Sequence, residues 1–237
     1  MNTILLEKSD FTAPGRVVLN DYRLEHMRKV LKSTPGSRCK VGLLEGNLGT
    51  GEVLTIDNTQ AELLVTLDAP PPEPIDLVLA CAMQRPQTYK KVLHIAITMG
   101  VKKLVFFGSF KVEKSYWDSP VLSPEIFKRE SITALEQCCD TVMPQVEYHR
   151  YFKKFVEDEL PRLSSGRTVY IAHPVCGQEF PVQPAKPALL LVGPEGGFTD
   201  YEVSRLLEAG AVGGTLGSRI LRTEVALPSL LGRFAGA

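Results

Sequence analysis

The sequence predicts an α/β protein in which a parallel sheet is covered by helices on both faces and a small β-barrel precedes that sheet. Two observations predict this fold class. After a proline-rich segment at residues 69–74, apolar runs of strand length alternate with amphipathic runs of helix length. Before that segment, the apolar runs are short and turn residues separate them, which is typical of a small barrel.

The amino-terminal part contains one predicted helix, at residues 22–31, among short strands. Four prolines between residues 70 and 74 cannot continue a helix or a central strand, so they predict a stiff extended linker. The predicted strands of this part lie at residues 38–44, 52–56 and 61–67.

The part after the linker alternates between strands and helices. An amphipathic helix is expected at residues 87–99, stopped by Gly100, and another begins after the N-cap Ser123. Such alternation places ligands outside the carboxyl ends of the strands. The apolar runs predict strands at residues 76–82, 101–107, 169–172 and 188–192.

Two glycine-rich turns near the carboxyl end carry most of the functional information. In ALLLVGPEGGFTDYEV, a buried strand precedes Gly193, Gly196 and Gly197, which let the backbone turn sharply and approach a ligand closely. Thr199 and Glu202 then form a capping box that predicts a helix start. The segment GGTLGSRILRTEVA repeats this plan with a strand at residues 211–216, a turn, and a last helix over about residues 223–231.

The residue types in these turns restrict the ligand. Neither turn has the Gly-Lys-Ser/Thr or G-x-G-x-x-G pattern of phosphate-binding turns. Glu195 would repel a pyrophosphate, but it could accept hydrogen bonds from ribose hydroxyls or lie near a cation. S-adenosylmethionine, which has an adenosine and a sulfonium but no phosphate, suits these features. The alternative is that the glycines only form tight turns.

GPEGGFTDYEV and LGSRILRTEVA resemble the two signature segments of the ribosomal RNA small subunit methyltransferase E family, a part of the SPOUT superfamily. DYRLEHMRKVLKSTPGSRCKV resembles the family's amino-terminal RNA-binding motif, and LEQCCDTVMPQV resembles a segment in which a helix ends before a proline, so the resemblance covers the whole chain. It implies a PUA-like β-barrel that binds RNA at residues 1–70. It also implies a SPOUT methyltransferase domain with a carboxyl-terminal trefoil knot at residues 75–237.

The activity implied by the resemblance is S-adenosylmethionine-dependent methylation of N3 of a uridine in 16S ribosomal RNA. Arg219 or Arg222 could stabilise charge on a uracil oxygen, and Glu224 could accept a proton. Alternatively, Arg222 and Glu224 form an ion pair. The chain could also modify another RNA, such as transfer RNA, or bind RNA without catalysis. The candidate cofactor-binding residues are His173, Pro174, Val192, Gly193, Pro194, Glu195, Gly196, Gly197, Leu216, Gly217, Ile220, Leu221 and Thr223.

The net charge is zero, with 27 basic and 27 acidic residues, which taken alone argues against a nucleic-acid-binding protein. Basic residues nevertheless cluster in two stretches, from Arg23 to Lys40 and from Arg85 to Lys114, and we expect these to form one RNA-binding face unless they are solvated surface lysines and arginines. Tyr116 and Trp117 either stack on an extruded base or anchor their loop. The candidate RNA-binding residues are Arg28, Lys29, Lys32, Arg85, Lys111 and Lys114.

Further expectations concern location, metals and assembly. No apolar run approaches the ~20 residues that span a bilayer, and the first residues lack a signal pattern, so we expect a cytoplasmic protein without membrane contact. Cysteines and histidines lack ligand spacing, which predicts no metal. The apolar side chains of the last helix predict a homodimer, which in the resembling family packs across a two-fold axis. These side chains are Val225, Leu227, Leu230 and Leu231.

Overall fold

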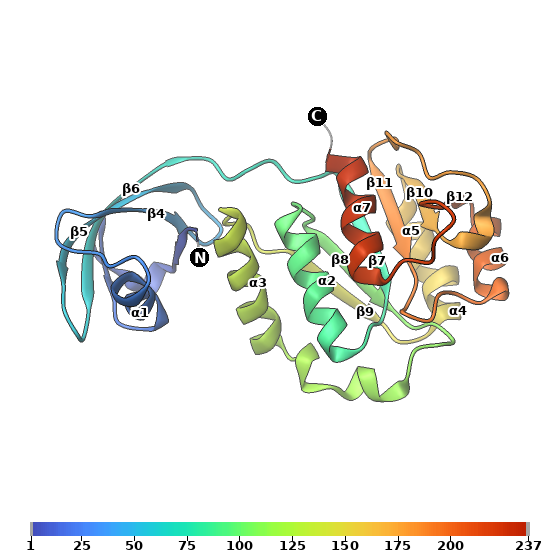
Figure 1. The fold of residues 1–237 in the computed structure, drawn as a ribbon, viewed down its shortest axis with the longest axis horizontal. Coiled ribbons are helices and arrows are strands. Elements are labelled where there is room, and N and C mark those ends of the chain that lie inside the picture. Colours follow the sequence, from blue (N-terminus) through green and yellow to red (C-terminus); the bar gives the residue numbers. More distant parts are fainter. Residues whose placement is uncertain (1, 236–237) are drawn as a thin grey trace. The chain divides into compact units, whose positions relative to one another are not determined.

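The computed structural model describes residues 2–235, which form two compact units (Figure 1). The first unit contains the chain up to Pro72 together with Ile132–Met143, and the second contains the remainder. The chain passes from the first unit to the second at the proline-rich segment. The return of residues 132–143 to the first unit has no counterpart in the sequence-based division, because no composition change marks it.

The first unit is built on a six-stranded mixed sheet with the strand order β1-β4-β5-β6-β3-β2. β1 pairs parallel with β4, and the other neighbours are antiparallel. Three of these strands were not predicted, because runs of three or four residues are too short to show a period of two. The strands are β1 (Ile4–Leu6), β2 (Phe11–Ala13), β3 (Arg16–Leu19), β4 (Arg38–Leu43), β5 (Leu48–Ile56) and β6 (Ala61–Ala69).

Helix α1 (Tyr22–Lys29) packs Leu24 and Met27 into the core of this sheet. Arg23, on the same helix, is buried and donates hydrogen bonds to Asp10 (2.6 and 2.8 Å) and to the carbonyl of Leu5 (2.7 Å). Arg23 therefore belongs to the folded core of the unit, although the sequence placed it at the start of a basic, RNA-facing stretch. A 3-10 turn at Lys8–Asp10 brings Asp10 to this position.

The carboxyl end of helix α3 (Pro124–Cys138) completes the first unit. The carbonyl of Glu136 accepts hydrogen bonds from the backbone N–H groups of Asn2 (2.9 Å) and Thr3 (3.0 Å). The Glu136 carboxylate accepts one from the Tyr22 hydroxyl (3.2 Å), and burial raises the pKa of this carboxyl. The start of the chain is thus tied to residues more than a hundred positions away.

The second unit contains a six-stranded sheet with the strand order β12-β10-β11-β7-β8-β9. Every neighbouring pair in this sheet is parallel, as the alternation of strands and helices predicts. The strands are β7 (Leu77–Ala82), β8 (Lys103–Phe107), β9 (Gln145–His149), β10 (Thr168–Ala172), β11 (Ala188–Val192) and β12 (Val212–Gly214).

Helices cover both faces of the parallel sheet (Figure 1). On one face, Tyr89 of α2 (Pro86–Thr98) packs on Phe106, and Phe234 of α7 (Thr223–Ala235) packs on Tyr170. The opposite face is covered by α5 (Leu160–Ser164) and α6 (Asp200–Glu208), preceded by α4 (Phe152–Lys154) and a π-helical turn at Phe155–Glu159. Short 3-10 turns lie at Lys114–Asp118, Pro120–Leu122 and Pro174–Cys176.

The α/β class with a parallel sheet is confirmed, and the predicted elements of this unit are present with shifted ends. β9 was missed because an edge strand that is only half-buried lacks an apolar run. The helical residues 152–164 were also not predicted. Within residues 2–235, no helix is both long enough and apolar enough to cross a membrane.

Candidate active site

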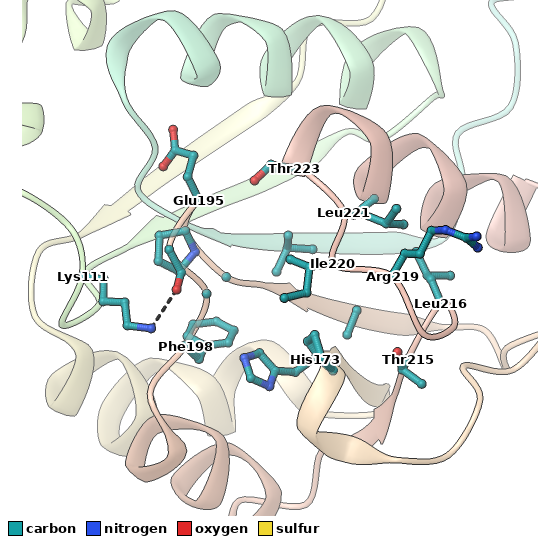
Figure 2. A pocket seen from close by; sticks show the side chains of 18 residues that line it. Lys111, His173, Glu195, Phe198, Thr215, Leu216, Arg219, Ile220, Leu221 and Thr223 are labelled. Carbon is teal, nitrogen blue, oxygen red and sulfur yellow. Dashed lines mark hydrogen bonds between the residues drawn. The ribbon is translucent and has the colours of Figure 1, made fainter.

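The candidate site forms where three neighbouring parallel strands end at the same level. Ala172, the last residue of β10, pairs with Val192 of β11 on one side and Gly214 of β12 on the other. The segments that follow these strands therefore leave the sheet side by side and surround a cavity of about 350 Å³ (Figure 2). The cavity is lined by 18 residues, which come from residues 172–174, 192–198 and 215–226, with Lys111 from a fourth segment.

The first glycine turn has one residue that requires glycine for its backbone conformation. Gly197 has φ +68°, whereas Gly193 and Gly196 do not lie in the left-handed region. A β-carbon at position 197 would also lie 3.5 Å from Nε2 of His173, on the wall of the cavity. The predicted capping box follows at once, with Thr199 and Glu202 hydrogen-bonded to each other's backbone N–H groups (3.3 and 2.9 Å). The turn therefore leads from the end of β11 at Val192 to the start of α6 at Asp200 within seven residues.

Lys111 lines the cavity from the loop after β8, which the sequence assigned only to RNA binding. Its ammonium Nζ donates a hydrogen bond to the carbonyl of Gly196 (2.7 Å). The preceding residue is also held, because the backbone N–H of Phe110 donates to Oε1 of the buried Glu202 (2.8 Å). Two hydrogen bonds thus fasten this loop to the first glycine turn.

Gln84 joins the first glycine turn to the start of α7, and it was not identified from the sequence. Its fully buried amide Nε2 donates to the carbonyls of Ala82 (2.8 Å) and Gly193 (3.0 Å). Its Oε1 accepts a hydrogen bond from the hydroxyl of Thr223 (3.3 Å), at the start of α7. A glutamine within MQRPQ matches no motif, so only the burial of its side chain could reveal this role.

Glu195 does not contact the cavity in the predicted manner. Its Oε1 accepts a hydrogen bond from the backbone N–H of Arg85 (3.0 Å), and Figure 2 shows the side chain turned away from the other lining side chains. The structure therefore does not prepare this carboxylate to accept the expected hydrogen bond from a ribose hydroxyl. Glu195 instead links the first glycine turn to the start of α2.

His173 forms part of the wall, as predicted, and its surroundings disfavour the charged imidazolium. Burial lowers the pKa of its imidazole, and the nearby ammonium of Lys111 lowers it further. Nδ1 accepts a hydrogen bond from the backbone N–H of Val175 (3.4 Å), so the ring proton sits on Nε2. A hydrogen bond with the backbone of Phe198 opposes these two effects in part, and it ties the ring to the first glycine turn.

The three predicted catalytic residues are placed differently from one another. Arg219 lines the cavity, with its guanidinium directed outward in Figure 2, whereas Arg222 and Glu224 are not among the lining residues. Because α7 begins at Thr223, the side chain of Glu224 points towards α2 and pairs with Lys91 (3.1 Å). Its own backbone N–H and Lys91 lower the pKa of Glu224. The structure thus places this carboxylate away from the cavity and pairs it with a residue other than Arg222.

Twelve of the thirteen predicted cofactor-binding residues line the cavity, and Gly217 is the exception. Gly217 belongs to the exposed tip of the second turn, with φ +118°. The residues that the sequence missed are small or apolar neighbours on the same segments. They are Ala172, Phe198, Thr215 and Ala226.

The candidate RNA-binding residues of the first unit are surface residues around the end of α1. Arg28 donates a hydrogen bond to Asn58, and Lys29 pairs with Glu25 one helical turn earlier. Lys32 follows with a left-handed backbone conformation (φ +51°). These partners are exposed, so the ion pair is weak and can exchange for a phosphate contact.

The candidate RNA-binding residues of the second unit lie near the cavity. Lys111 lines it, and Arg85 donates a hydrogen bond to the hydroxyl of Tyr116 (3.2 Å). Lys114 is exposed and has no ion-pair partner among the described residues. That these residues and those of the first unit act as one surface stays a prediction.

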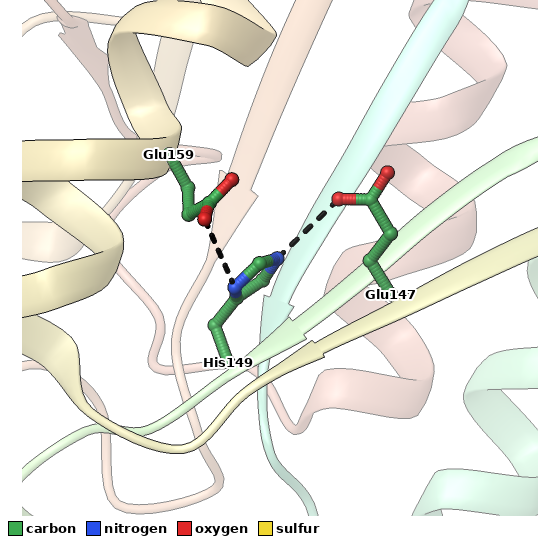
Figure 3. Close-up of side chains that lie close together, drawn as sticks. All are labelled: Glu147, His149 and Glu159. Carbon is green, nitrogen blue, oxygen red and sulfur yellow. Dashed lines mark hydrogen bonds and ion pairs between the residues drawn. The ribbon is translucent and has the colours of Figure 1, made fainter.

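One cluster of potential metal ligands exists in the described structure, which the sequence did not anticipate (Figure 3). His149 lies between Glu147 (Nε2 to Oε2, 3.3 Å) and Glu159 (Nδ1 to Oε1, 3.8 Å). Arg162 bridges the two carboxylates (2.6 and 2.9 Å), and Lys103 also pairs with Glu147. Burial raises the pKa of Glu147, but hydrogen bonds from Lys103, Arg162 and His149 lower it to about 2. Because two cations already balance this cluster, it is best explained as an ion-pair network between strands and helix.

The fold and the cavity define a class of protein: an α/β protein with a ligand pocket at the carboxyl ends of a parallel sheet. The model of the RNA methyltransferase domain family matches residues 71–235. The chain therefore belongs to that family.

Individual proteins extend the similarity to nearly the whole chain. Ribosomal RNA small subunit methyltransferase E 1 of Borreliella burgdorferi is 23% identical over 229 residues, which cover 95% of this chain and 94% of that protein. The structure of a ribosomal RNA small subunit methyltransferase E of Neisseria gonorrhoeae bound to S-adenosylmethionine has a TM-score of 0.75 and 23% identity, covering 98% of this chain and 95% of that one. A putative methyltransferase of Legionella pneumophila in complex with the same cofactor has a TM-score of 0.73 and 22% identity, covering 99% and 97%. The family resemblance read from the two signature segments is confirmed.

The backbone conformation of Gly197 leads to the first testable prediction. Gly197→Ala is expected to lower the affinity for S-adenosylmethionine about tenfold or more, because the new β-carbon enters the cavity wall and the turn is strained by about 1–2 kcal/mol. Isothermal titration calorimetry measures the affinity. Gly166→Ala is the matched control, because Gly166 has φ +72° with nothing within 4 Å of the added carbon. Equal affinities of the two variants would show that this turn does not contact the cofactor.

Proposed function

We propose that this chain transfers a methyl group from S-adenosylmethionine to ribosomal RNA of the small subunit, and that its target atom is N3 of a uridine. The cavity between the two glycine turns, in a chain of the RNA methyltransferase domain family, carries the proposal. Two relatives that this chain matches over 94% and 95% of their length bear the name of small subunit methyltransferases. Two structural neighbours were solved with bound S-adenosylmethionine. Such an enzyme works where ribosomes are assembled, which in a bacterium is the cytoplasm.

The cavity suits S-adenosylmethionine by size and chemistry. A volume of about 350 Å³ lies within the range of small-ligand pockets, and apolar side chains such as Val192, Leu216 and Leu221 can enclose an adenine. Only two lining residues are cationic: Lys111, whose ammonium is hydrogen-bonded to Gly196, and Arg219, whose guanidinium points outward. The cavity thus lacks the cation cluster that a phosphate-bearing cofactor requires.

The bound cofactor would supply an electrophilic methyl group on a positively charged sulfur. Uracil N3 carries a proton that must pass to water before or during the attack, because Glu224 does not line the cavity, so the enzyme has to favour the uracil anion. Among the predicted catalytic residues, Arg219 is the one on the cavity wall, and we assign it the stabilisation of charge on a uracil carbonyl oxygen. His173 lines the same cavity and would contact the bound ligand.

A carboxyl-terminal trefoil knot is part of the proposal. Its support is the close packing of residues 178–181 against the end of β12. The backbones of Thr215, Gln178 and Phe180 are joined by hydrogen bonds (2.8 and 2.9 Å). A β-carbon on Gly214 would lie 2.6 Å from Cα of Phe180, so the two backbones are as close as they can be. The proposed knot would be an exception to the rule that chains do not thread loops.

For the first unit we propose a PUA-like RNA-binding function. Its six-stranded mixed sheet supports this assignment, as do the exposed basic residues Arg28, Lys29 and Lys32. Phosphate contacts of this kind fix the position of the RNA and leave recognition of the target base to the second unit.

We also propose that the chain forms a homodimer, on a basis different from the one the sequence offered. Leu227, Leu230 and Leu231 are fully buried in the core of their own unit, so they are not available to a partner. Val225 is 52% exposed, and Ile220, on the loop before α7, is 89% exposed. Ile220 lines the cavity and Val225 directly precedes the lining residue Ala226, and these two apolar side chains are the ones that a second copy could cover.

Nucleoside analysis of a deletion strain tests the proposed activity. We expect 3-methyluridine to disappear from small subunit RNA when the gene is deleted and to return on complementation, as measured by mass spectrometry. If 3-methyluridine persists and a transfer RNA loses a methyl group instead, the chain modifies another RNA. If no nucleoside changes and the purified protein does not bind the cofactor, the chain only binds RNA.

A charge reversal in the first unit tests its role in RNA binding. Arg28→Glu with Lys29→Glu is expected to weaken RNA binding by about tenfold or more and to reduce its salt dependence, because two phosphate contacts are lost. Affinity for S-adenosylmethionine should be unchanged. Lys8→Glu with Arg16→Glu is the control, since it changes the net charge equally on the same unit outside the basic stretch. Equal loss in both double variants would contradict a specific RNA-binding site around α1.

Analytical ultracentrifugation tests the assembly. The wild-type protein is expected to sediment as a dimer at micromolar concentration, and Val225→Asp should shift it towards the monomer, because a charge would be buried in the interface. Because Val225 is half exposed in the single chain, its replacement should leave the unfolding temperature of the monomer nearly unchanged. A monomeric wild-type protein would refute the proposal.

A further inference from the structure

Phe110 is the most exposed aromatic side chain in the described part of the molecule. It is 83% exposed, whereas the other phenylalanines between residues 2 and 235 are buried or half-buried. A single exposed apolar residue is common on protein surfaces and by itself indicates nothing. The position of Phe110 is what distinguishes it, because the next residue, Lys111, lines the cofactor cavity.

The backbone that carries Phe110 is held firmly although the ring is free. Its N–H donates a hydrogen bond to Oε1 of Glu202 (2.8 Å), a carboxylate that is 98% buried, since only 2% of the residue is exposed. Glu202 Oε2 is in turn fixed by the N–H and the hydroxyl of Thr199 (both 2.9 Å). On the other side, Lys111 is anchored to the Gly196 carbonyl (2.7 Å). The backbone that carries the ring is thus fixed beside a residue that lines the cavity.

The charges next to Phe110 suit an anionic polymer. A turn closed by the hydrogen bond from the Val112 N–H to the Ser109 carbonyl (3.1 Å) contains Phe110 and Lys111. Lys114, four residues from Phe110, is exposed and has no ion-pair partner among the described residues. An exposed aromatic ring with a cation a few residues away is the usual composition of a single-stranded RNA-binding surface, in which bases stack on rings and phosphates meet lysines.

We propose that Phe110 is the platform on which an unpaired RNA base stacks at the entrance of the cofactor cavity, with Lys114 contacting an adjacent phosphate. The inference rests on the proposed function, because it names the part of the substrate that this rim receives. A base whose N3 is to be methylated cannot remain paired, since pairing occupies N3, so the enzyme needs a surface that stabilises the unpaired base. Phe110 is then a substrate-binding residue.

The two aromatic residues singled out from the sequence are less suited to this role. The Tyr116 hydroxyl accepts a hydrogen bond from Arg85 (3.2 Å) and donates one to Glu113 (3.0 Å), and its ring is half-buried. Trp117 is also half-buried, in the 3-10 turn at Lys114–Asp118. Both therefore fit the alternative reading, in which they anchor the loop that Phe110 precedes.

Steady-state methyl transfer to small subunit RNA tests the proposal with three substitutions of Phe110. Stacking of one base corresponds to roughly a 5- to 150-fold effect, so Phe110→Ala should lower kcat/KM for RNA by about that factor. Phe110→Tyr should retain activity within about threefold, whereas Phe110→Leu, which keeps apolar volume without an aromatic face, should resemble the alanine variant. Cofactor affinity and unfolding temperature should not change, because the side chain is almost entirely exposed.

Tyr201→Ala is the matched control, because Tyr201 is another exposed aromatic residue of the second unit, on α6 (66%). This control should keep the wild-type kcat/KM. An unchanged kcat/KM for Phe110→Ala, or full activity of Phe110→Leu, would overturn the stacking role. A loss of dimer in sedimentation without any change in the RNA parameters would also overturn it, by showing that Phe110 contacts a second protein copy.

A binding measurement keeps this inference separate from the proposed activity. In Phe110→Trp, stacking on a short oligouridylate should quench the fluorescence of the new tryptophan, whereas the wild-type protein, with Trp117 alone, should show little quenching. Quenching without methyl transfer by the wild-type protein would refute the activity and keep the platform. Methyl transfer without quenching would refute the platform and keep the activity.

Discussion

The parallel register of β10, β11 and β12 is the constraint on which the candidate site depends. Because Ala172, Val192 and Gly214 lie at one level, the segments that follow them must leave the sheet together, and a cavity forms between them. There is no room for a side chain where two of these segments approach most closely. Glycine is found at such a point, as at Gly214 next to Phe180. Strand pairing, which is determined by the core, therefore determines the shape of the pocket as well.

Two buried polar side chains keep the segments around the cavity in place. Gln84 joins the end of β7, the first glycine turn and the start of α7, and Glu202 joins the first turn to the loop of Phe110. Inside a protein, a buried polar group is stable only when its hydrogen bonds are made, so each of these residues specifies one arrangement of its partners. The pocket is consequently organised before any ligand arrives.

Some charged side chains are held by other protein groups, whereas others are exposed and can contact RNA. Arg23, Glu195 and Glu224 are each engaged by protein groups. Lys114 and the exposed residues at the end of α1 keep their charges accessible. A chain with no net charge can bind RNA in this way, because basic residues that are concentrated on one surface create a local positive potential.

The sequence by itself determined the class of fold, the two glycine turns, the capping box at Thr199 and nearly all of the cavity-lining residues of these turns. These features depend on local chemistry: apolar runs, helix caps, and glycines within a few residues of one another. Only the tertiary structure showed that Gln84 and Lys111 are hydrogen-bonded to the first glycine turn and that Phe110 precedes a cavity-lining residue, because all three lie far along the chain from that turn. It also decided that Glu224 pairs with Lys91 and that the leucines of α7 are buried. The direction of a side chain depends on what packs around it, and a pattern of residue types along one chain does not contain that information.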